Sequence, residues 1–246
     1  MVVRALVSRL FDSVVNRGLS FRVDHWLYPP TCLVCGLAAE SDSDCCSGCR
    51  DDLPTVASGC ARCGLELARS VEQCGRCLAR PPCFDAAFPA FAYRGPVEGL
   101  VQRFKFNRDL AAGRVLAEQM ARRIQALQPP MPDCLVPVPL HYRRRWWRGF
   151  NQAELLCRDL VRCLGSPEWR PLLRRRQATA AQLALPAERR RGNVRGAFAA
   201  RPIPPGVRHV ALVDDVMTTG STLDECARIL KAAGIQRVDV WVVARA

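Results

Sequence analysis

The sequence predicts an α/β fold, in which a parallel sheet flanked by helices follows a small cysteine-rich domain. From residue 133 onward, short apolar runs alternate with helical patterns, an order that requires crossover connections between parallel strands. Two of these runs are followed by loops suited to binding, at 140–150 and 214–222. Nearer the N-terminus, C-x-x-C pairs recur at a constant spacing, which is typical of zinc ribbons.

Composition and charge are those of a globular protein with a preference for anionic partners. The chain has 246 residues, of which 49% are hydrophobic and 24% charged, so it has room for one large domain or two modest ones. A formal net charge of +13 favours polyanions, nucleotides and phosphates. No apolar stretch is long enough to span a bilayer, and Arg4, Arg9 and Asp12 interrupt any secretory signal. We therefore expect a cytoplasmic protein with reduced thiols and without stable membrane insertion.

Residues 1–27 are predicted to form an amphipathic helix. Apolar side chains recur there at i, i+3 and i+4 spacing, while the arginines lie elsewhere. The apolar positions are Leu6, Val7, Leu10, Phe11, Val14 and Val15. We favour packing of this helix on the domain that follows, and binding to a membrane surface is the alternative.

Residues 28–83 are predicted to form a double zinc ribbon. The four C-x-x-C pairs begin 14 residues apart and comprise Cys32, Cys35, Cys46, Cys49, Cys60, Cys63, Cys74 and Cys77. Four thiolates close a tetrahedral zinc site without an open position, so we expect two structural Zn²⁺ ions. Sequential and interleaved pairings both satisfy the spacing, and an iron–sulfur cluster is a weaker alternative. Cys45 could replace Cys46 as a ligand, but only Cys46 keeps the C-x-x-C spacing.

Pro81 and Pro82 mark the expected boundary to the second domain, residues 84–246. The expected elements are strands at 84–93, 133–139, 210–213 and 238–244 and helices at 97–107, 110–127, 153–164 and 222–233. Lys105 is either a solvated helix charge or a phosphate contact. The cysteines outside the ribbon pattern are expected to be buried small apolar residues. They are Cys83, Cys134, Cys157, Cys163 and Cys226.

An arginine-rich loop reads H-Y-R-R-R-W-W-R-G-F-N-Q at residues 141–152. Because it follows an apolar run, it can hold pyrophosphate oxygens through Arg148 and the backbone at Gly149. Arginines beside Trp146 and Trp147 would equally suit single-stranded nucleic acid, by phosphate contacts and base stacking. The third interpretation is a basic surface whose tryptophans lie in the core.

Residues 170–195 form a second basic segment, which is predicted to be a flexible loop that seeks a phosphate. The segment holds eight arginines and one acidic residue. Gln182, Arg190 and Asn193 are its distinctive polar residues, and glycines near its end would let it move. A solvated basic linker is the alternative.

The stretch V-A-L-V-D-D-V-M-T-T-G-S-T, residues 210–222, carries the most specific signal. We expect a buried strand that ends at Asp214 and Asp215, followed by a loop that leads into a helix. The loop residues are Thr218, Thr219, Gly220, Ser221 and Thr222. Backbone N–H groups and hydroxyls at a helix N-terminus favour a phosphate, whereas carboxylates suit a ribose diol or Mg²⁺. Phosphate and ribose at fixed spacing indicate a 5-phosphoribosyl group.

This stretch resembles the phosphoribosyl-pyrophosphate (PRPP) motif of type I phosphoribosyltransferases. Over nearly the whole chain, the sequence is similar to the ComF family, also named for GntX, whose members are competence-associated and related to amidophosphoribosyltransferases. Besides the double zinc ribbon, the similarity rests on Y-R-G at 93–95, K-F at 105–106, V-P-V-P-L at 136–140, R-G-F-N-Q at 148–152, Gln182, Arg190, Asn193-Val194, Ala197-Phe198 and D-D-V-M-T-T-G-S-T at 214–222.

The resemblance implies a type I phosphoribosyltransferase fold and a role for each motif. Asp214 and Asp215 would hold the ribose and Mg²⁺, and the loop 218–222 would hold the 5′-phosphate. Arg148 and Gly149 would lie on the pyrophosphate side. The second basic segment would be the closing flap. The family is linked to the uptake of single-stranded DNA during natural transformation.

Three functional hypotheses follow. The first is a competence-linked protein that binds PRPP with Mg²⁺; its enzymatic form is an active nucleobase or amine phosphoribosyltransferase of nucleotide metabolism or salvage. The second is a binding protein for single-stranded DNA, favoured by the basic charge. The third makes the zinc ribbon a docking piece for a helicase-like competence partner.

Overall fold

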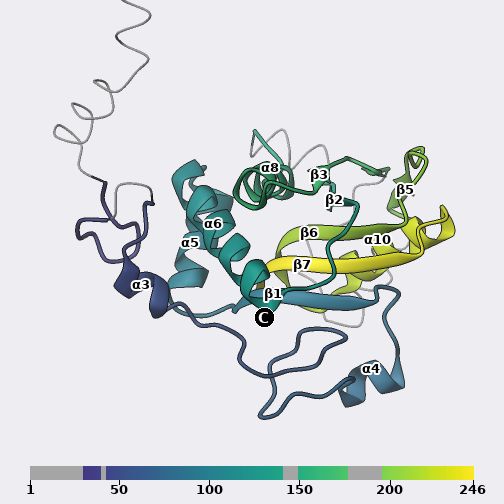
Figure 1. The fold of residues 1–246 in the computed structure, drawn as a ribbon, viewed down its shortest axis with the longest axis horizontal. Helices are drawn as coiled ribbons and strands as arrows, with labels where there is room; N and C mark the ends of the chain where they lie inside the picture. Colours follow the sequence, from purple (N-terminus) through teal and green to yellow (C-terminus); the bar gives the residue numbers. More distant parts are fainter. Residues whose placement is uncertain (1–29, 40–42, 141–148, 177–195) are drawn as a thin grey trace, which may run out of the picture. The chain divides into compact units, whose positions relative to one another are not determined.

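The computed structural model describes residues 30–39, 43–140, 149–176 and 196–246 (Figure 1). Contacts divide the chain into two compact units, Met1–Asp52 and Leu53–Ala246. The domain boundary expected at Pro81 and Pro82 stays a prediction. Several predicted features lie outside the described residues, namely the helix at 1–27, Trp146, Trp147 and Arg148 of the arginine-rich loop, and Gln182, Arg190 and Asn193 of the second basic segment.

The smaller unit contains the first two cysteine knuckles. An isolated antiparallel bridge closes the loop that carries Cys32 and Cys35. Helix α3, Ser47–Asp51, begins after Cys46, whose Sγ accepts a hydrogen bond from the backbone N–H of Cys49 (3.5 Å). The short helix therefore brings the second pair of cysteines together.

The larger unit is built on a five-stranded sheet in the order β1-β7-β6-β2-β3, and every neighbouring pair is parallel. Its strands are β1 (Ala86–Ala92), β2 (Cys134–Pro137), β3 (Glu168–Trp169), β6 (His209–Met217) and β7 (Arg237–Arg245). The central strands β6 and β7 are buried over most of their length, as expected for parallel strands covered on both faces. The predicted parallel sheet is thereby confirmed.

The predicted helices of this unit are confirmed, and local signals set their ends. They are α5 (Pro96–Phe106), α6 (Leu110–Leu127), α8 (Gln152–Leu164) and α10 (Ser221–Ala232), and a short α4 (Gly75–Ala79) precedes them. Pro96 fits the first turn of α5, where an N–H would have no helical partner. Asp109 caps α6 by accepting a hydrogen bond from the N–H of Ala112, and Gly165 ends α8 in a left-handed conformation.

Successive side chains of β6 and β7 point to opposite faces of the sheet, so the two strands contribute to a core on each face. On one face, Leu212 and Val240 belong to a buried cluster with Leu223 and Leu230 of α10. Trp241, the next residue of β7, is also fully buried, and α6 and α8 contact the sheet as well. Each large apolar side chain buried in this way stabilises the fold by about 1.5–3 kcal/mol.

The structure corrects the expected end of β6 and the expected burial of two cysteines. The strand continues four residues beyond residue 213, so Asp214 and Asp215 lie within it rather than after it. It is prolonged because β7 pairs with it as far as Met217 and Arg245. Cys163, near the end of α8, is exposed and not buried as expected, and Cys83 is only partly buried.

The first part of the second basic segment is a strand rather than a loop. β4 (Leu173–Arg175) and β5 (Phe198–Ala200) form an antiparallel hairpin. Leu172 and Leu173 are buried, which anchors β4 to the core. The three consecutive arginines that follow them mask this apolar signal in the sequence.

The second ribbon, which we define as residues 59–79, belongs to the larger unit and packs on its sheet. Its four cysteines lie in the same buried cluster as side chains of β6 and β7. A Cβ on Gly64 would lie 2.7 Å from Cδ of Pro89 in β1, so glycine is needed for this close approach. Glu66 forms a bidentate salt bridge with Arg94, at 2.6 and 3.1 Å.

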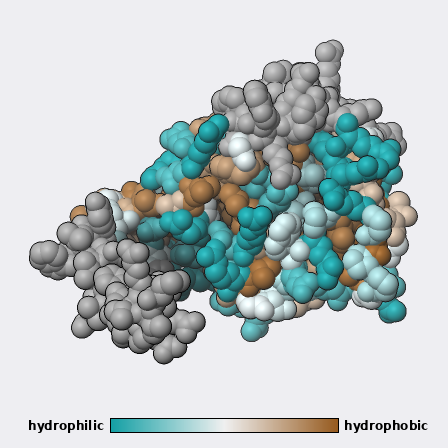
Figure 2. All heavy atoms as spheres, turned by 90° about the horizontal axis from the view of Figure 1, so that it is seen from above, coloured by the Kyte–Doolittle hydropathy of each residue, from teal (hydrophilic) through white to brown (hydrophobic). Residues whose placement is uncertain are grey.

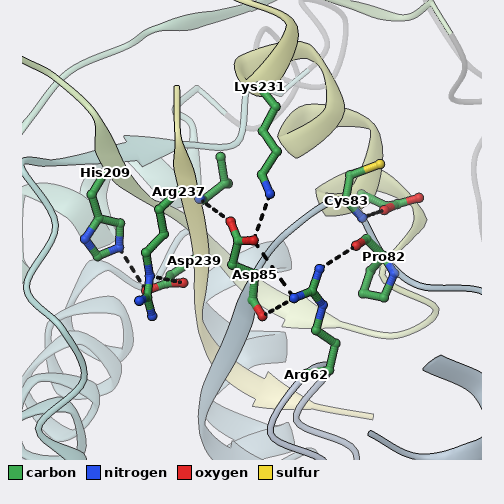
Figure 3. A network of polar contacts seen from close by, with 10 residues as sticks. Arg62, Pro82, Cys83, Asp85, His209, Lys231, Arg237 and Asp239 are labelled. Atoms are coloured by element: carbon green, nitrogen blue, oxygen red, sulfur yellow. Dashed lines mark hydrogen bonds and ion pairs between the residues drawn. The ribbon is translucent and has the colours of Figure 1, made fainter. Parts of the chain in front are cut away.

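A polar network joins the second ribbon to β7 and α10 (Figure 3). Arg62 donates hydrogen bonds to the carbonyl oxygens of Asp85 (2.8 Å) and Pro82 (3.0 Å). The Asp85 carboxylate accepts hydrogen bonds from Nζ of Lys231 (2.8 Å) and from the N–H of Val238 (2.8 Å). Burial opposes ionisation of Asp85, but the hydrogen bonds from Lys231 and Val238 outweigh it and hold the pKa of this carboxyl below its ordinary value.

The fully buried carboxylate of Asp239 is the second centre of Figure 3. Its Oδ2 lies 2.9 Å from Nε2 of His209 and 3.1 Å from Nε of Arg237. These partners stand at the amino ends of β6 and β7, far along the strands from Asp214 and Asp215. They offset the cost of burying a charge, which is a structural role.

Hydrophobic side chains are interspersed with hydrophilic ones on the coloured part of the face seen in Figure 2. The large hydrophobic side chains exposed among the described residues are Leu37, Leu78, Phe106, Leu110, Leu127 and Met131. In the described part of the chain, every helix is too short or too polar to cross a membrane.

Asp85→Asn is expected to lower the free energy of unfolding at pH 7 by about 1–3 kcal/mol, because it weakens charge-assisted hydrogen bonds. A carboxyl whose pKa is lowered by folding stabilises the protein above its unfolded pKa of about 3.9, and this contribution is lost as the pH falls through the folded pKa. Urea unfolding at pH 7 and pH 3 measures the effect. Glu168→Gln, at the exposed ion pair with Arg170, is the control and should change stability by less than about 0.5 kcal/mol. An Asp85→Asn loss as large at pH 3 as at pH 7 would contradict this assignment.

Candidate functional site

The carboxyl edge of the sheet is stepped where β2 meets β6. Pro137, the last residue of β2, pairs with Val213, whereas β6 runs on to Met217. The backbone N–H of Val138 still donates to the carbonyl of Val213 (3.0 Å), and the chain then leaves β6. Ligands of open α/β sheets bind at such carboxyl ends, and the step falls beside Asp214.

The two adjacent acids of β6 have different surroundings. Because successive side chains of a strand leave it on opposite faces, Asp214 and Asp215 diverge from one another. The N–H of Asp215 donates to Oδ1 of Asp214 (2.9 Å), and the N–H of Val216 donates to Oδ1 of Asp215 (2.6 Å). Both carboxylates are therefore held against the backbone of the strand.

Asp215 is paired with Lys105, a residue whose role the sequence left open. Nζ of Lys105, on α5, lies 2.8 Å from Oδ1 of Asp215. The side chains are only 20% and 11% exposed, so solvent screens the pair less than a surface ion pair. Removing either partner would leave a largely buried charge, which is costly. The pair thus places one positive and one negative group at the end of the sheet.

The loop after β6 turns the chain into α10 through a left-handed glycine. Gly220 adopts φ +77°, a left-handed conformation that favours glycine. The hydroxyls of Thr219 and Ser221 lie 2.9 Å apart. The N–H of Asp224 then donates to the carbonyl of Gly220 (2.8 Å), which begins α10. The structure thus places the predicted phosphate loop at a helix N-terminus.

The end of the arginine-rich loop is fixed beside α5. Asn151 is buried, donates to the carbonyl of Val138 (3.1 Å), and caps α8. The ring of Phe150 stacks on Phe104 with the centroids 5.7 Å apart. Phe104 precedes Lys105 on α5, so this helix connects the loop to the acid pair. Gly149 adopts φ +85° and lies next to these residues in the chain, whereas its predicted partner Arg148 lies outside the described residues.

The two described residues that flank most of the predicted flap, Arg176 and Ala197, are hydrogen-bonded to each other. The N–H of Arg176 donates to the carbonyl of Ala197 (2.7 Å), which closes the base of the segment between them. The N–H of Gly196 donates to Oε1 of Glu225 in the second turn of α10 (2.9 Å). The base of the segment is thereby attached to the helix that starts at the phosphate loop.

The eight ribbon cysteines form two groups of four, Cys32, Cys35, Cys46 and Cys49, and Cys60, Cys63, Cys74 and Cys77. Within each group the sulfurs lie within 4.8 Å of one another, so the structure selects the sequential pairing. Sγ–Sγ separations of 3.8 Å occur in both groups, for example between Cys35 and Cys46. A zinc tetrahedron with Zn–S bonds of about 2.3 Å has edges of about 3.8 Å. The donor sets therefore fit two structural zinc ions.

Cys45 is distinguished from Cys46 by its environment. Cys45 is fully buried and lies outside the four-cysteine group, and burial raises the pKa of its thiol to about 11. Cys46, by contrast, belongs to the group of four sulfurs that lie within 4.8 Å of one another, so the structure favours Cys46 over Cys45 as the ligand.

Comparisons with known proteins extend over most of the chain. Residues 23–78 match the model of a double zinc ribbon domain. Competence protein F of Haemophilus influenzae is 39% identical over 209 residues, which cover 82% of this chain and 90% of that protein. DNA utilization protein YhgH of Salmonella typhimurium is 39% identical over 224 residues, which cover 88% and 97%. The solved structure of the allosteric regulatory enzyme of purine biosynthesis aligns with 53% of this chain and 25% of that chain, at 20% identity and a TM-score of 0.35.

Cys46→Ser is expected to lower the zinc content from about two ions per chain to about one, because it removes a thiolate from the first group. Cys45→Ser, a change of the neighbouring thiol, is the matched control and should retain both ions. Elemental analysis of the purified proteins measures the content. Loss of zinc from Cys45→Ser together with full content in Cys46→Ser would reverse the assignment.

Proposed function

This chain belongs to the competence protein F family, and on that basis we propose that it binds PRPP with Mg²⁺ at the carboxyl end of β6 and handles DNA during natural competence. The ligand proposal rests on one continuous segment, which comprises β6, the loop that follows it and the start of α10. The buried strand β6 carries two adjacent carboxylates shortly before its end at Met217, and a hydroxyl-rich loop then turns into α10 at Gly220. This order supplies a diol acceptor and a phosphate cradle at fixed spacing.

The 5′-phosphate would bind at the loop 218–222. The N–H groups of the first turn of α10 and the hydroxyls of Thr219 and Ser221 are donors suited to its oxygens. The left-handed Gly220 has no side chain, so a phosphate can approach the backbone closely.

The ribose and pyrophosphate would lie over the stepped edge of the sheet. The carboxylates of Asp214 and Asp215 can accept hydrogen bonds from the ribose hydroxyls. They are also hard oxygen ligands that would hold Mg²⁺, which would supply positive charge beside the pyrophosphate when bound. Lys105 offsets part of the negative charge of Asp215, which eases the approach of an anionic ligand.

Phosphoribosyl transfer is the reaction that such a site can support. An acceptor nitrogen would form a bond to C1′ of PRPP while the bond from C1′ to pyrophosphate breaks, and the electron pair leaves with pyrophosphate. The carboxylates at the ribose would stabilise positive charge that grows on the sugar. Arg148 and Gly149 would contact the leaving pyrophosphate, and the flap with Gln182, Arg190 and Asn193 would exclude water.

Asp214→Asn and Asp215→Asn are expected to weaken Mg-PRPP binding at least about tenfold each, because an amide replaces a charged acceptor. Isothermal calorimetry of the purified full-length proteins measures the dissociation constant. Glu168→Gln removes one carboxylate at an exposed position and should bind like the wild type. Absence of binding by folded wild-type protein, or equal affinity of all three variants, would rule out this site.

Binding of single-stranded DNA is the second part of the proposal. Its support is the net charge of +13 and the names of the relatives, which refer to competence and to DNA utilization. Exposed arginines that contact phosphates release counterions, so the affinity of such binding falls steeply with salt.

The affinity for a fluorescently labelled single-stranded oligonucleotide of arbitrary sequence should fall at least about tenfold between 50 and 200 mM salt. Replacing Arg143, Arg144 and Arg145 together by alanine should weaken binding at low salt and flatten this dependence. Fluorescence anisotropy measures both. Affinity that is independent of salt, or a triple variant that binds as tightly as the wild type, would contradict electrostatic binding of DNA by the arginine-rich loop.

A further inference from the structure

We propose that the second ribbon contributes to the phosphate site. In this proposal, Arg76 of the ribbon and Arg245 of β7 orient the backbone of the phosphate loop, residues 218–222. This inference rests on the proposed function, because it concerns the same loop. Zinc at the second group would then have a role beyond local folding. It would fix the ribbon segment that presents Arg76.

Arg245 links a zinc-ligand residue to the loop. Its side chain lies at the end of β7 and is almost fully buried. One guanidinium nitrogen, Nη1, donates to the carbonyls of Met217 (3.0 Å) and Thr218 (2.6 Å). Nε of the same group donates to the carbonyl of Cys63 (3.3 Å). A single buried cation thus holds the ribbon and the loop together.

Arg76 makes a second link from the ribbon to the loop. Its Nη2 donates to the carbonyl of Thr219 (2.7 Å), 143 residues away in the chain. Arg76 lies in α4 between Cys74 and Cys77, which belong to the same four-cysteine group. A zinc ion held by these two cysteines would fix the backbone on both sides of Arg76.

These bonds determine where the loop's own donors point. In a planar trans peptide, the carbonyl of one residue and the N–H of the next point in opposite directions. The arginines hold the carbonyls of three consecutive residues, 217, 218 and 219. The N–H groups of the next residues, 218, 219 and 220, are thereby directed away from the arginines. Consecutive N–H groups arranged in this way form an anion-binding concavity.

The ribbon and the loop also share a cavity wall. A cavity of about 350 Å³ is lined by Cys63 and Cys77 of the ribbon and by Thr219, Gly220 and Ser221 of the loop. Both arginines of the proposal, Arg76 and Arg245, contribute to its lining, as do Asp224 and Glu225 of α10.

Besides Arg76 and Arg245, two contacts connect the ribbon and the segment that follows it to α10. In the following segment, the N–H of Cys83 donates to Oδ1 of Asp224 (2.6 Å) in the first turn of α10. Arg62 is attached to Asp85, whose carboxylate accepts from Lys231 near the end of that helix. The ribbon and the segment that follows it are therefore connected to both ends of α10. We expect a change in the ribbon to alter the backbone of the phosphate loop.

Arg76→Ala tests the inference without removing a zinc ligand. Arg69→Ala removes the same charge from an exposed position of the same ribbon and is the matched control. In the ligand-free proteins, hydrogen exchange measured by mass spectrometry should be about fivefold faster in peptides covering residues 217–222 of Arg76→Ala, and unchanged in Arg69→Ala. Zinc content should be equal in both. Arg76→Lys keeps one donor and should restore most of the protection.

Calorimetry with Mg-PRPP adds a second readout. We expect about fivefold weaker binding by Arg76→Ala and wild-type affinity for Arg69→Ala. Equal exchange of the loop in the two alanine variants, or loss of zinc from Arg76→Ala, would overturn the inference. If the wild type fails to bind PRPP while the loop exchange still differs, the proposed ligand is wrong and the link between ribbon and loop is supported.

Discussion

The buried guanidinium of Arg245 is the interaction on which the carboxyl end of the sheet depends. A buried cation must have its N–H groups satisfied, and here they meet carbonyls of Met217, Thr218 and Cys63. The ends of β6 and β7 and a knuckle of the second ribbon are therefore fixed at one point. Replacing this side chain by a smaller one would leave several carbonyls without their partner, so its effect would reach the loop, the sheet and the ribbon together.

Two further features position the residues of the candidate site. The prolonged pairing of β6 with β7 brings Asp214 and Asp215 onto a rigid strand rather than a loop. Lys105 pairs with Asp215 from a helix whose neighbouring residue Phe104 packs on Phe150, so the ion pair and the arginine-rich loop share one support. Rigid support of this kind is what precise ligand placement requires. The two ribbons, although alike in spacing, belong to different compact units, and the second is part of the unit that holds this arrangement.

Much of the fold and of the candidate site could be predicted because the signals are local. The helix and strand patterns, the C-x-x-C spacing and the run 210–222 each occupy one short stretch of sequence. The pairing of Lys105 with Asp215 and of Arg76 with the carbonyl of Thr219 joins residues more than a hundred positions apart, and such contacts leave no periodic signature. The β4–β5 hairpin was missed for a different reason, since buried leucines are flanked by arginines that suggest a solvated loop. The extra length of β6 depends on its pairing with β7, and strand propensity alone does not predict such pairing.

A crystal structure of the full-length protein with Mg²⁺ and PRPP tests the central claim most directly. We expect the 5′-phosphate to accept hydrogen bonds from backbone N–H groups of residues 218–222. The ribose hydroxyls should lie within hydrogen-bonding distance of Asp214 or Asp215. PRPP found at another place on the protein, or no bound ligand at a saturating concentration, would contradict the assignment of this loop as a phosphoribosyl site.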